Sequence, residues 1–532
     1  MNSSDVQTFV DSFADKMHEL STQHSLAEWD LATTGAEAAQ QRTVDLEVRY
    51  AALFQSREDF DRVKSWRASA DQLPPDLRRC LELLYLAFLT NHADLDLSRK
   101  MAELASSMQG AYINFRASFR GHEVSDNVLR DTLRTAEDSE TAQHAWEAGK
   151  EIGSAVYESA IQLARLRNRA AQESGFENYY PWALATQELD ERALLELLET
   201  LEHITSEPYR QTKEILDKRL ATRFGVSVDQ LRPWHYGEPF FQELPEAADP
   251  RVEALFAERD PVVLGKATFN GLNMRLDDVL ERSDLYERAH KDQHAFCTHI
   301  DRLSPDVRVL ANLRSDLRWT GTLLHELGHA AYDTFLEPTM PYLLRDIAHI
   351  STTEAIAIMM GDLTFDRVWL TRIAAAPAEA AEAMSATLAA ERRFNDLIFI
   401  RWALVVIHFE HDLYQNPDRT DLNHVWWQLV NRFQFLNPPG DRDRPDWAAK
   451  IHIALYPAYY QNYVIGMLTA AQLRRVIDCD YGGLVDSTAA GEFLKERLFR
   501  LGARYPWNET IKRVTGEYLQ PNYFAEKVRA SQ

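Results

Sequence analysis

Apolar residues recur at steps of three and four along most of this chain. The pattern is clear between residues 194 and 204, where acidic residues separate the apolar positions Leu194, Leu195, Leu197, Leu198, Leu201 and Ile204. Such spacing places the apolar side chains on one face of an α-helix. The 532 residues include only 20 glycines and 20 prolines, so few positions favour turns. We therefore expect long amphipathic helices whose apolar faces pack in the interior.

The helical pattern is interrupted where turn-forming residues gather. These breaks lie at residues 74–75, 233–239, 338–341 and 437–445. None is a long flexible linker, and the chain shows no internal repeat. Residues 295–313 differ from the rest, because two short apolar runs flank the turn Ser304-Pro305-Asp306. The pattern predicts an all-α protein with one small β-hairpin.

Charge and composition exclude several classes of partner. The formal net charge of −23 would repel a nucleic-acid backbone and an anionic membrane surface. The longest apolar stretch lies between Asp396 and Asp412, and the charged or polar residues Arg401, His408 and Glu410 interrupt it. That stretch is too short to span a bilayer. We expect neither a nucleic acid nor a membrane as a partner.

The cysteines and the first residues indicate the compartment. Cys80, Cys297 and Cys479 are odd in number, widely spaced and without a CxxC pair, which argues against a disulfide framework and against a thiolate metal site. The first twenty residues lack the basic and apolar regions of a signal peptide. A cytoplasmic location is the prediction.

The sharpest chemical signal is HELGH at positions 325–329, inside a stretch of helical periodicity. On a helix, His325 and His329 lie one turn apart on the same face, so both imidazoles can bind one Zn2+. Glu326 lies beside them and can take a proton from a water at the metal. Two histidines and a glutamate have no packing reason to share an apolar face, so we expect a hydrolytic zinc site.

Two histidines leave zinc short of ligands. The metzincin arrangement needs glycine and histidine where this chain has Tyr332 and Phe335, so it is excluded. A new helix is expected near residue 352, with Ser351 or Thr352 as its N-cap, and Glu354 in its first turns is the expected third ligand. The alternatives within reach are Asp346, His349 and Asp362.

A third group of residues lies far downstream. Its members are Lys450, His452, Pro457, Tyr459, Tyr460 and Tyr463. Histidine or tyrosine donors can stabilise the negative charge that develops when an amide is hydrolysed. Lysine can hold a substrate carboxylate as a point charge. The alternative is an aromatic-rich helix that serves packing, with a solvated lysine.

Taken together, these motifs resemble a known family. HELGH, then TTEAIA at 352–357, then K-x-H followed by YxxY, are similar to the angiotensin-converting-enzyme group of zinc peptidyl-dipeptidases. They also resemble oligoendopeptidase F and thimet oligopeptidase, which are gluzincins too. Further similar stretches are LAEWDLATTG at 26–35, LARLRNRAAQESGFENYY at 163–180, LRPWHYGEPFFQE at 231–243 and RWALVVIHFEHDLY at 401–414. The resemblance covers nearly the whole chain.

The resemblance implies a role for each of these residues. One zinc ion per chain would be held by His325, His329 and Glu354, with Glu326 as general base and then acid. His452 and Tyr463 would stabilise the oxyanion, and Lys450 with Tyr460 would bind the C-terminal carboxylate of a short peptide. It also implies that residues 1–532 form a single peptidase unit of two helical subdomains around a deep channel, with the 295–313 hairpin beside the substrate.

Three positions depart from the family pattern. The spacing after His452 is one residue longer than in the converting enzymes, so Tyr459 and Tyr460 could exchange roles. Ile358 stands where many gluzincins place an aspartate that orients a zinc histidine, which leaves Asp333 as a candidate for that task. Asn462 stands where the mammalian enzymes place an arginine that helps bind chloride, so no such chloride dependence is expected.

The sequence thus predicts a zinc metallopeptidase that releases dipeptides from the C-terminus of short peptides. An oligoendopeptidase and a metallocarboxypeptidase are the alternatives with the same chemistry. A more remote alternative is an inactive peptide-binding protein, although an intact HELGH with its glutamate argues against it. The sequence does not indicate the side-chain preference, the oligomeric state or the metal used in the cell.

Overall fold

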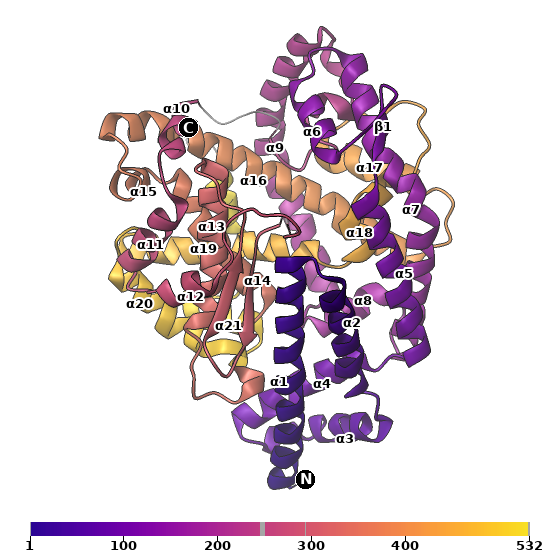
Figure 1. Cartoon of the computed structure of the whole chain (residues 1–532), viewed down its shortest axis with the longest axis vertical. Helices are drawn as coiled ribbons and strands as arrows, with labels where there is room; N and C mark the ends of the chain where they lie inside the picture. Colours follow the sequence, from indigo (N-terminus) through magenta and orange to yellow (C-terminus); the bar gives the residue numbers. More distant parts are fainter. Residues whose placement is uncertain (1, 245–249, 293, 530–532) are drawn as a thin grey trace. The chain divides into compact units, whose positions relative to one another are not determined.

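Helices dominate the computed structural model, which describes residues 2–244, 250–292 and 294–529 (Figure 1). Within these residues, the strands form two antiparallel sheets of two strands each. The prediction of an all-α protein with a small hairpin is therefore confirmed. None of the described helices combines the length and the apolar character needed to cross a membrane.

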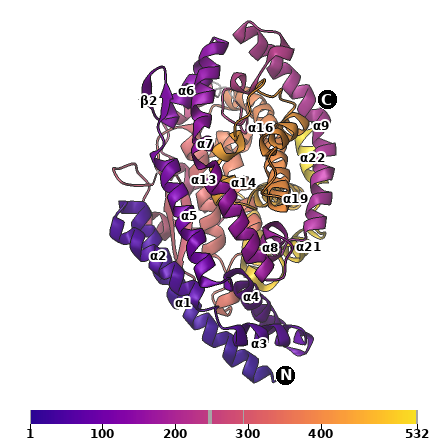
Figure 2. The same ribbon diagram turned by 90° about the vertical axis from the view of Figure 1, so that its right-hand side faces the viewer.

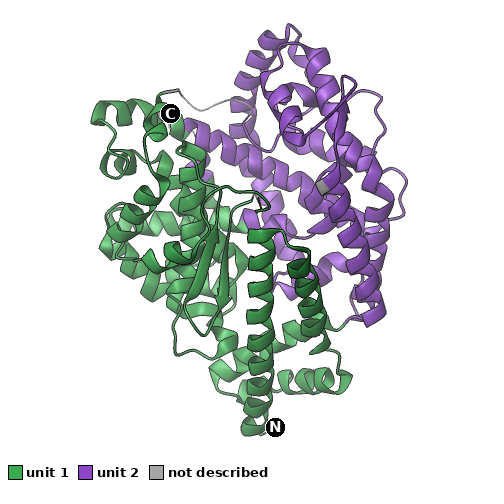
Figure 3. Cartoon of the chain, viewed as in Figure 1, with its two compact units in different colours: residues 1–92, 248–389, 465–524 green, residues 93–247, 390–464, 525–532 purple. Residues whose placement is uncertain are grey.

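The chain divides into two compact units, each assembled from separate stretches of sequence (Figure 3). The first comprises Met1–His92, Ala248–Ala389 and Ile465–Phe524, and the second comprises Ala93–Ala247, Ala390–Val464 and Ala525–Gln532. Helices α16 (Ala378–Gln415), α19 (Tyr460–Tyr481) and α22 (Asn522–Val528) include three of the points where the chain passes from one unit to the other.

The first unit contains one long helix, α1, several shorter helices and the longer hairpin. Its helices are α1 (Ser3–Thr34), α2 (Glu37–Ala52), α3 (Arg57–Arg67), α4 (Pro75–Asn91), α10 (Pro250–Ala257), α11 (Pro261–Gly271), α12 (Asp277–Arg282), α13 (Leu317–Thr334), α14 (Ile350–Gly361), α15 (Arg367–Arg372), α20 (Thr488–Arg497) and α21 (Trp507–Thr515). Its 3-10 turns are η1 (Ala70–Gln72), η4 (Tyr342–Leu344), η5 (Asp362–Phe365) and η7 (Phe499–Arg504). Its strands are β3 (Phe296–Asp301) and β4 (Asp306–Leu310).

The second unit is built around long helices, which Figure 2 shows along their length. Its elements are α5 (Leu95–Asn114), β1 (Ala117–Phe119), β2 (His122–Val124), α6 (Asp126–Thr135), α7 (Ser139–Glu173), α8 (Tyr179–Thr186), α9 (Glu191–Phe224), η2 (Val228–Gln230), η3 (Pro233–Tyr236), α17 (Leu422–Gln434), η6 (Asp446–Ala449) and α18 (Ile451–Leu455).

Helix α9 shows why the apolar stripe forms a helix. The Asp190 carboxylate caps its start by accepting a hydrogen bond from the Ala193 backbone N–H at 2.8 Å. Leu198 and Leu201 are fully buried. The helix ends at Gly225, whose φ of 63° is a left-handed conformation that glycine adopts without strain. Caps at both ends and a buried face between them thus fix its length.

Of the two hairpins, only the longer one was predicted from the sequence pattern. Strands β3 and β4 pair as predicted, with Cys297 opposite Val309 and an irregularity between His299 and Asp301. The β1–β2 hairpin was not predicted. Each of its strands has three residues, too few to show an alternating pattern, and its turn uses Arg120 with a φ of 53° and the following glycine.

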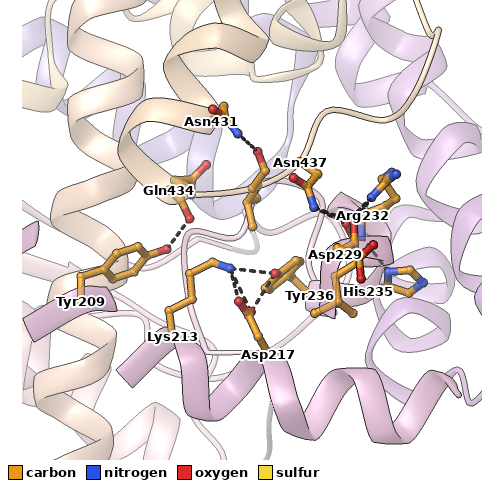
Figure 4. Close-up of polar contacts among 12 residues, drawn as sticks. Tyr209, Lys213, Asp217, Asp229, Arg232, His235, Tyr236, Asn431, Gln434 and Asn437 are labelled. Atoms are coloured by element: carbon orange, nitrogen blue, oxygen red, sulfur yellow. Dashed lines mark hydrogen bonds and ion pairs between the residues drawn. The ribbon is translucent and has the colours of Figure 1, made fainter. Parts of the chain in front are cut away.

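A buried polar network holds the segment after α9 in the second unit (Figure 4). The Lys213 ammonium donates to Asp217 Oδ2 at 2.7 Å and to the Tyr236 hydroxyl at 2.9 Å, while that hydroxyl donates to Asp217 Oδ1 at 2.8 Å. The side chain of Asn437 donates to the carbonyls of Asp229 and Leu231. These bonds attach residues 229–236 to α9 and to the segment after α17.

Removing one partner of this network should be costly, because the Lys213 and Asp217 side chains are only 5% and 13% exposed. Asp217→Ala leaves a buried ammonium without its counter-charge. We expect it to lower the opening free energy of α9 by about 3–5 kcal/mol. Hydrogen exchange of peptides from α9 measures this quantity.

Glu173→Ala is the matched control, because it breaks the exposed Arg169–Glu173 ion pair on α7. That loss should stay below about 1 kcal/mol. If the two variants change hydrogen exchange equally little, the buried network does not hold this segment.

Candidate active site

Helix α13 carries the two histidines of HELGH. Asp316 starts the helix, since its carboxylate accepts a hydrogen bond from the Trp319 backbone N–H at 2.6 Å. The His325 and His329 rings lie on one face, with centroids 4.9 Å apart and ring planes at 81°. The helix therefore presents two imidazoles to the same point.

A glycine lets α14 approach α13 closely. A β-carbon at position 328 would lie 2.8 Å from the Ala357 Cα atom, which is too close for any other residue without a shift of the backbone. On the other side of α14, a β-carbon at Gly466 would lie 3.0 Å from the Glu354 Cβ atom. Small residues at these two positions allow Glu354 to stand opposite the histidines.

The three side chains form one cluster in the first unit. Glu354 Oε2 lies 3.7 Å from His325 Nε2 and 4.0 Å from His329 Nε2. One ligand atom from each residue lies within 4.8 Å of the other two, a grouping that could hold a metal ion. Asp346, His349 and Asp362 are not part of this cluster.

Burial makes the cluster electrostatically unfavourable in the absence of a cation. It raises the pKa of Glu354 to about 7 and lowers the pKa of His329 well below its usual value, an effect to which His325 adds. Burial, followed by the charge of Glu354, also raises the pKa of Glu326 to about 8, and a hydrogen bond from the Cys297 backbone N–H opposes this rise. A bound cation would favour the two carboxylates and the neutral imidazoles.

The residues around the cluster differ in part from those expected. His329 Nδ1 lies 2.7 Å from the Thr353 hydroxyl, a contact that the sequence did not indicate. Asp333 was the candidate for orienting a histidine of the motif. Its Oδ1 atom instead lies 3.9 Å from His299 Nδ1 on β3.

The start of α14 corrects one prediction. Neither Ser351 nor Thr352 is the N-cap, because the helix begins at Ile350 and His349 caps it. His349 Nδ1 accepts a hydrogen bond from the Ser351 backbone N–H at 3.1 Å. Serine and threonine are favoured at the N-cap, so the sequence did not predict a histidine there.

The downstream residues gather in the second unit. Lys450 is half-buried, and its ammonium donates to Gln242 Oε1 at 2.7 Å. It also lies about 6 Å from the rings of Phe240, Trp402 and Tyr460. Burial lowers its pKa to about 8. The role of Lys450 stays a prediction, as does the packing alternative.

Gln242 is a second residue that the sequence did not indicate, and its neighbours fix its orientation. Its side-chain amide nitrogen donates to Glu238 Oε1 at 2.9 Å, while its oxygen faces Lys450. A carboxylate only accepts and an ammonium only donates, so the amide cannot be reversed. Glu238 also accepts from the backbone N–H groups of Phe240 and Gln242. Gln242 thus separates Lys450 from the carboxylate of Glu238.

The aromatic residues after Lys450 form a chain of ring contacts. Tyr460 is buried, and its ring centroid lies 5.5 Å from that of His452 and 5.6 Å from that of Tyr463. Tyr459 lies 5.1 Å from Tyr463. His452, Tyr459 and Tyr463 are half-buried. These three side chains retain some access to solvent, whereas Tyr460 is enclosed.

Asn462 lies within the same segment and is 1% exposed. Its side-chain nitrogen donates to Gln187 Oε1 at 2.8 Å. The two neutral amides lie where the mammalian enzymes would have a chloride-binding arginine. The absence of a chloride dependence stays a prediction.

Comparison with protein families gives two matches along the chain. Residues 280–530 match peptidase family M3, and residues 1–228 match angiotensin-converting enzyme. The first range includes HELGH, Glu354 and the downstream group from Lys450 to Tyr463. The second includes the long helices α7 and α9.

Individual relatives agree with these matches. A mouse angiotensin-converting enzyme-like protein, Ace3, is 29% identical over 133 residues, which are 23% of this chain and 18% of that protein. Rabbit angiotensin-converting enzyme is 26% identical over 216 residues, or 38% of this chain and 16% of the enzyme. Thermostable carboxypeptidase 1 of Pyrococcus furiosus is 29% identical over 119 residues, or 20% and 23% of the respective chains.

The matched segments thus span less than a quarter of the length of each of these relatives. The two family matches nevertheless lie in order along the chain and leave only residues 229–279 between them. Together the two matches support a relation to the gluzincin peptidases, in the group that comprises the angiotensin-converting enzymes and peptidase family M3.

Proposed function

We propose that this protein is a zinc-dependent peptidase that acts on short peptides and releases dipeptides from their C-terminus. The observation that carries the proposal is the cluster of His325, His329 and Glu354 with Glu326 next to it on α13. Two imidazole nitrogens and one carboxylate are the ligand set of a hydrolytic zinc site, with a further position left for substrate or water.

The cluster fits a single zinc ion per chain. The charge of the ion would compensate the buried carboxylates, whose raised pKa values show the cost of burial. When bound, zinc would polarise the scissile carbonyl group and lower the pKa of the attacking water. Glu326 would accept the proton from that water and deliver it to the leaving amine, because a carboxylate beside the metal can act first as base and, once protonated, as acid.

His452 and Tyr463 are the proposed donors to the oxyanion. Both are half-buried and polar, and both belong to one chain of ring contacts. Hydrogen-bond donors of these two types can stabilise the negative charge that develops on the scissile carbonyl oxygen.

Lys450 is the proposed binding group for the C-terminal carboxylate of the substrate, with Tyr460 or Tyr459 beside it. Gln242 rather than Glu238 accepts the hydrogen bond from the lysine, so a substrate carboxylate would not have to displace an ion pair with Glu238. The low polarity of the surrounding rings strengthens such a charged contact.

A metallocarboxypeptidase is the second candidate, because the chain is also similar to a thermostable carboxypeptidase. An oligoendopeptidase remains a third, and an inactive peptide-binding protein a remote fourth.

The substrate channel between two helical subdomains stays a prediction. So does the cytoplasmic location, which is supported by the absence of a disulfide at Cys80, Cys297 and Cys479.

The first prediction tests the ligands. Glu354→Ala removes one of three metal ligands, so the purified variant should lose most of its zinc and its peptidase activity together. Elemental analysis after dialysis gives zinc per chain. Asp362→Ala is the control, because Asp362 lies outside the cluster and that variant should keep one equivalent. A Glu354→Ala protein with full zinc content and normal rates would contradict the assignment.

The second prediction separates catalysis from metal binding. Glu326→Gln should retain zinc but lose about 10²–10⁴ in turnover, the contribution typical of a positioned general base. Steady-state kinetics on a short peptide, with zinc content measured on the same sample, gives both values. Normal turnover in this variant would falsify the role of Glu326, because an amide cannot accept the proton.

The third prediction concerns the carboxylate. Amidation of a good substrate should raise KM and shift the cleavage position, and Lys450→Met should reduce this preference for free acid. The preference should also fall as the pH rises through about 8, because Lys450 then loses the proton that gives it its charge. The pH profile of kcat/KM and mass spectrometry of the products measure these effects.

The products separate the candidates. Dipeptides support the proposed exopeptidase, and single residues indicate a carboxypeptidase. If acid and amide peptides are cut at the same internal bond and at equal rates, the protein is an oligoendopeptidase.

A further inference from the structure

The contact between His329 and Thr353 has a specific chemical meaning. A neutral imidazole carries one N–H and one lone pair. His329 Nε2 faces Glu354 Oε2 at 4.0 Å, and Nδ1 lies 2.7 Å from Thr353 Oγ1. If Nε2 offers its lone pair to a metal, Nδ1 carries the proton and donates it to the threonine oxygen.

We propose that Thr353 is a positioning residue of the metal site, whose hydroxyl oxygen accepts the His329 Nδ1–H and so fixes both the ring orientation and the tautomer. This inference rests on the proposed zinc function. Thr353 acts through His329 and is assigned no contact with substrate.

The surroundings of Thr353 suit this task. It is 4% exposed and directly precedes Glu354 on α14, so the orienting residue and a ligand are fixed by the same helix. The approach of α14 at Gly328 sets the distance between the two helices. A β-branched side chain in a helix has few rotamers, which limits the positions of its hydroxyl group.

The usual alternative for an orienting group is a carboxylate, and here neither expected position supplies one. Ile358 is apolar, and Asp333 lies toward His299. A hydroxyl group also has an electrostatic advantage. Glu326 and Glu354 are already two buried carboxylates close together, and a third would add like-charge repulsion. A neutral acceptor orients the histidine without that cost.

The test compares two substitutions at position 353. Thr353→Val keeps the shape and removes the hydroxyl, while Thr353→Ser keeps the hydroxyl and removes a methyl group. We expect the valine variant to bind zinc about 10–100-fold more weakly, the usual effect of losing an orienting partner, and the serine variant to stay close to wild type. Competition with a chromophoric chelator gives the zinc dissociation constant.

Thr334→Val is the matched control. It removes a threonine hydroxyl on the same helix as the histidines, at a side chain that makes no hydrogen bond with any described residue. Its zinc affinity should equal that of wild type. Equal weakening in the serine and valine variants would overturn the proposal, because packing rather than the hydroxyl would then be responsible.

A second measurement does not depend on a substitution of Thr353. NMR of the zinc-loaded, 15N-histidine-labelled protein reports which ring nitrogen of each histidine is protonated. We expect a protonated, exchange-protected Nδ1 at His329, identified by its loss in His329→Gln. An unprotonated Nδ1 would overturn the inference.

The proposed zinc function and the proposed role of Thr353 can fail independently. If the wild-type protein binds no zinc, the proposed function is wrong. If it binds zinc tightly and Thr353→Val binds it equally well, the zinc site stands and the role of Thr353 is wrong.

Discussion

The close approach of α13 and α14 is the constraint on which the candidate active site depends. Gly328 has no β-carbon, so the backbone of α14 at Ala357 can come within a distance that alanine would forbid. One turn before Ala357, Glu354 then stands opposite His325 and His329. On the opposite faces, residues such as Leu324, Leu327, Ile356 and Met360 belong to one apolar core. Packing of that core therefore holds a polar cluster in place.

The arrangement of the cluster lowers the stability of its charged groups. The core excludes water from Glu326 and Glu354, which raises the pKa of both and makes their charged forms costly. A cation at the cluster would relieve that cost, so metal binding and the folded arrangement support each other. The second unit also contains charged groups that are bridged by a neutral one. The amide of Gln242 lies between Lys450 and Glu238 and takes the place of a direct ion pair. In both places charged side chains lie in surroundings of low polarity.

Periodicity and motif spacing predicted the parts of this picture that depend on local sequence. The helical class, the hairpin of β3 and β4, and the meeting of His325 and His329 on one face follow from repeats of a few residues. The grouping of Glu354 with them needed the resemblance to a family as well as a helix start. Contacts between distant segments were out of reach. Gln242 is 208 residues from Lys450, and nothing in the local pattern links them. Thr353 adjoins Glu354 in the sequence, but its neighbour His329 is 24 residues away, so no role for Thr353 was predicted from the sequence.

X-ray absorption at the zinc K-edge of the purified, zinc-loaded protein tests the central claim most directly, because it reports the ligands themselves. The account predicts nitrogen and oxygen ligands at about 2.0–2.1 Å, with the outer-shell scattering of two imidazole rings and no sulfur at about 2.3 Å. A sulfur ligand, or scattering from fewer than two imidazoles, would contradict a site built from His325, His329 and Glu354.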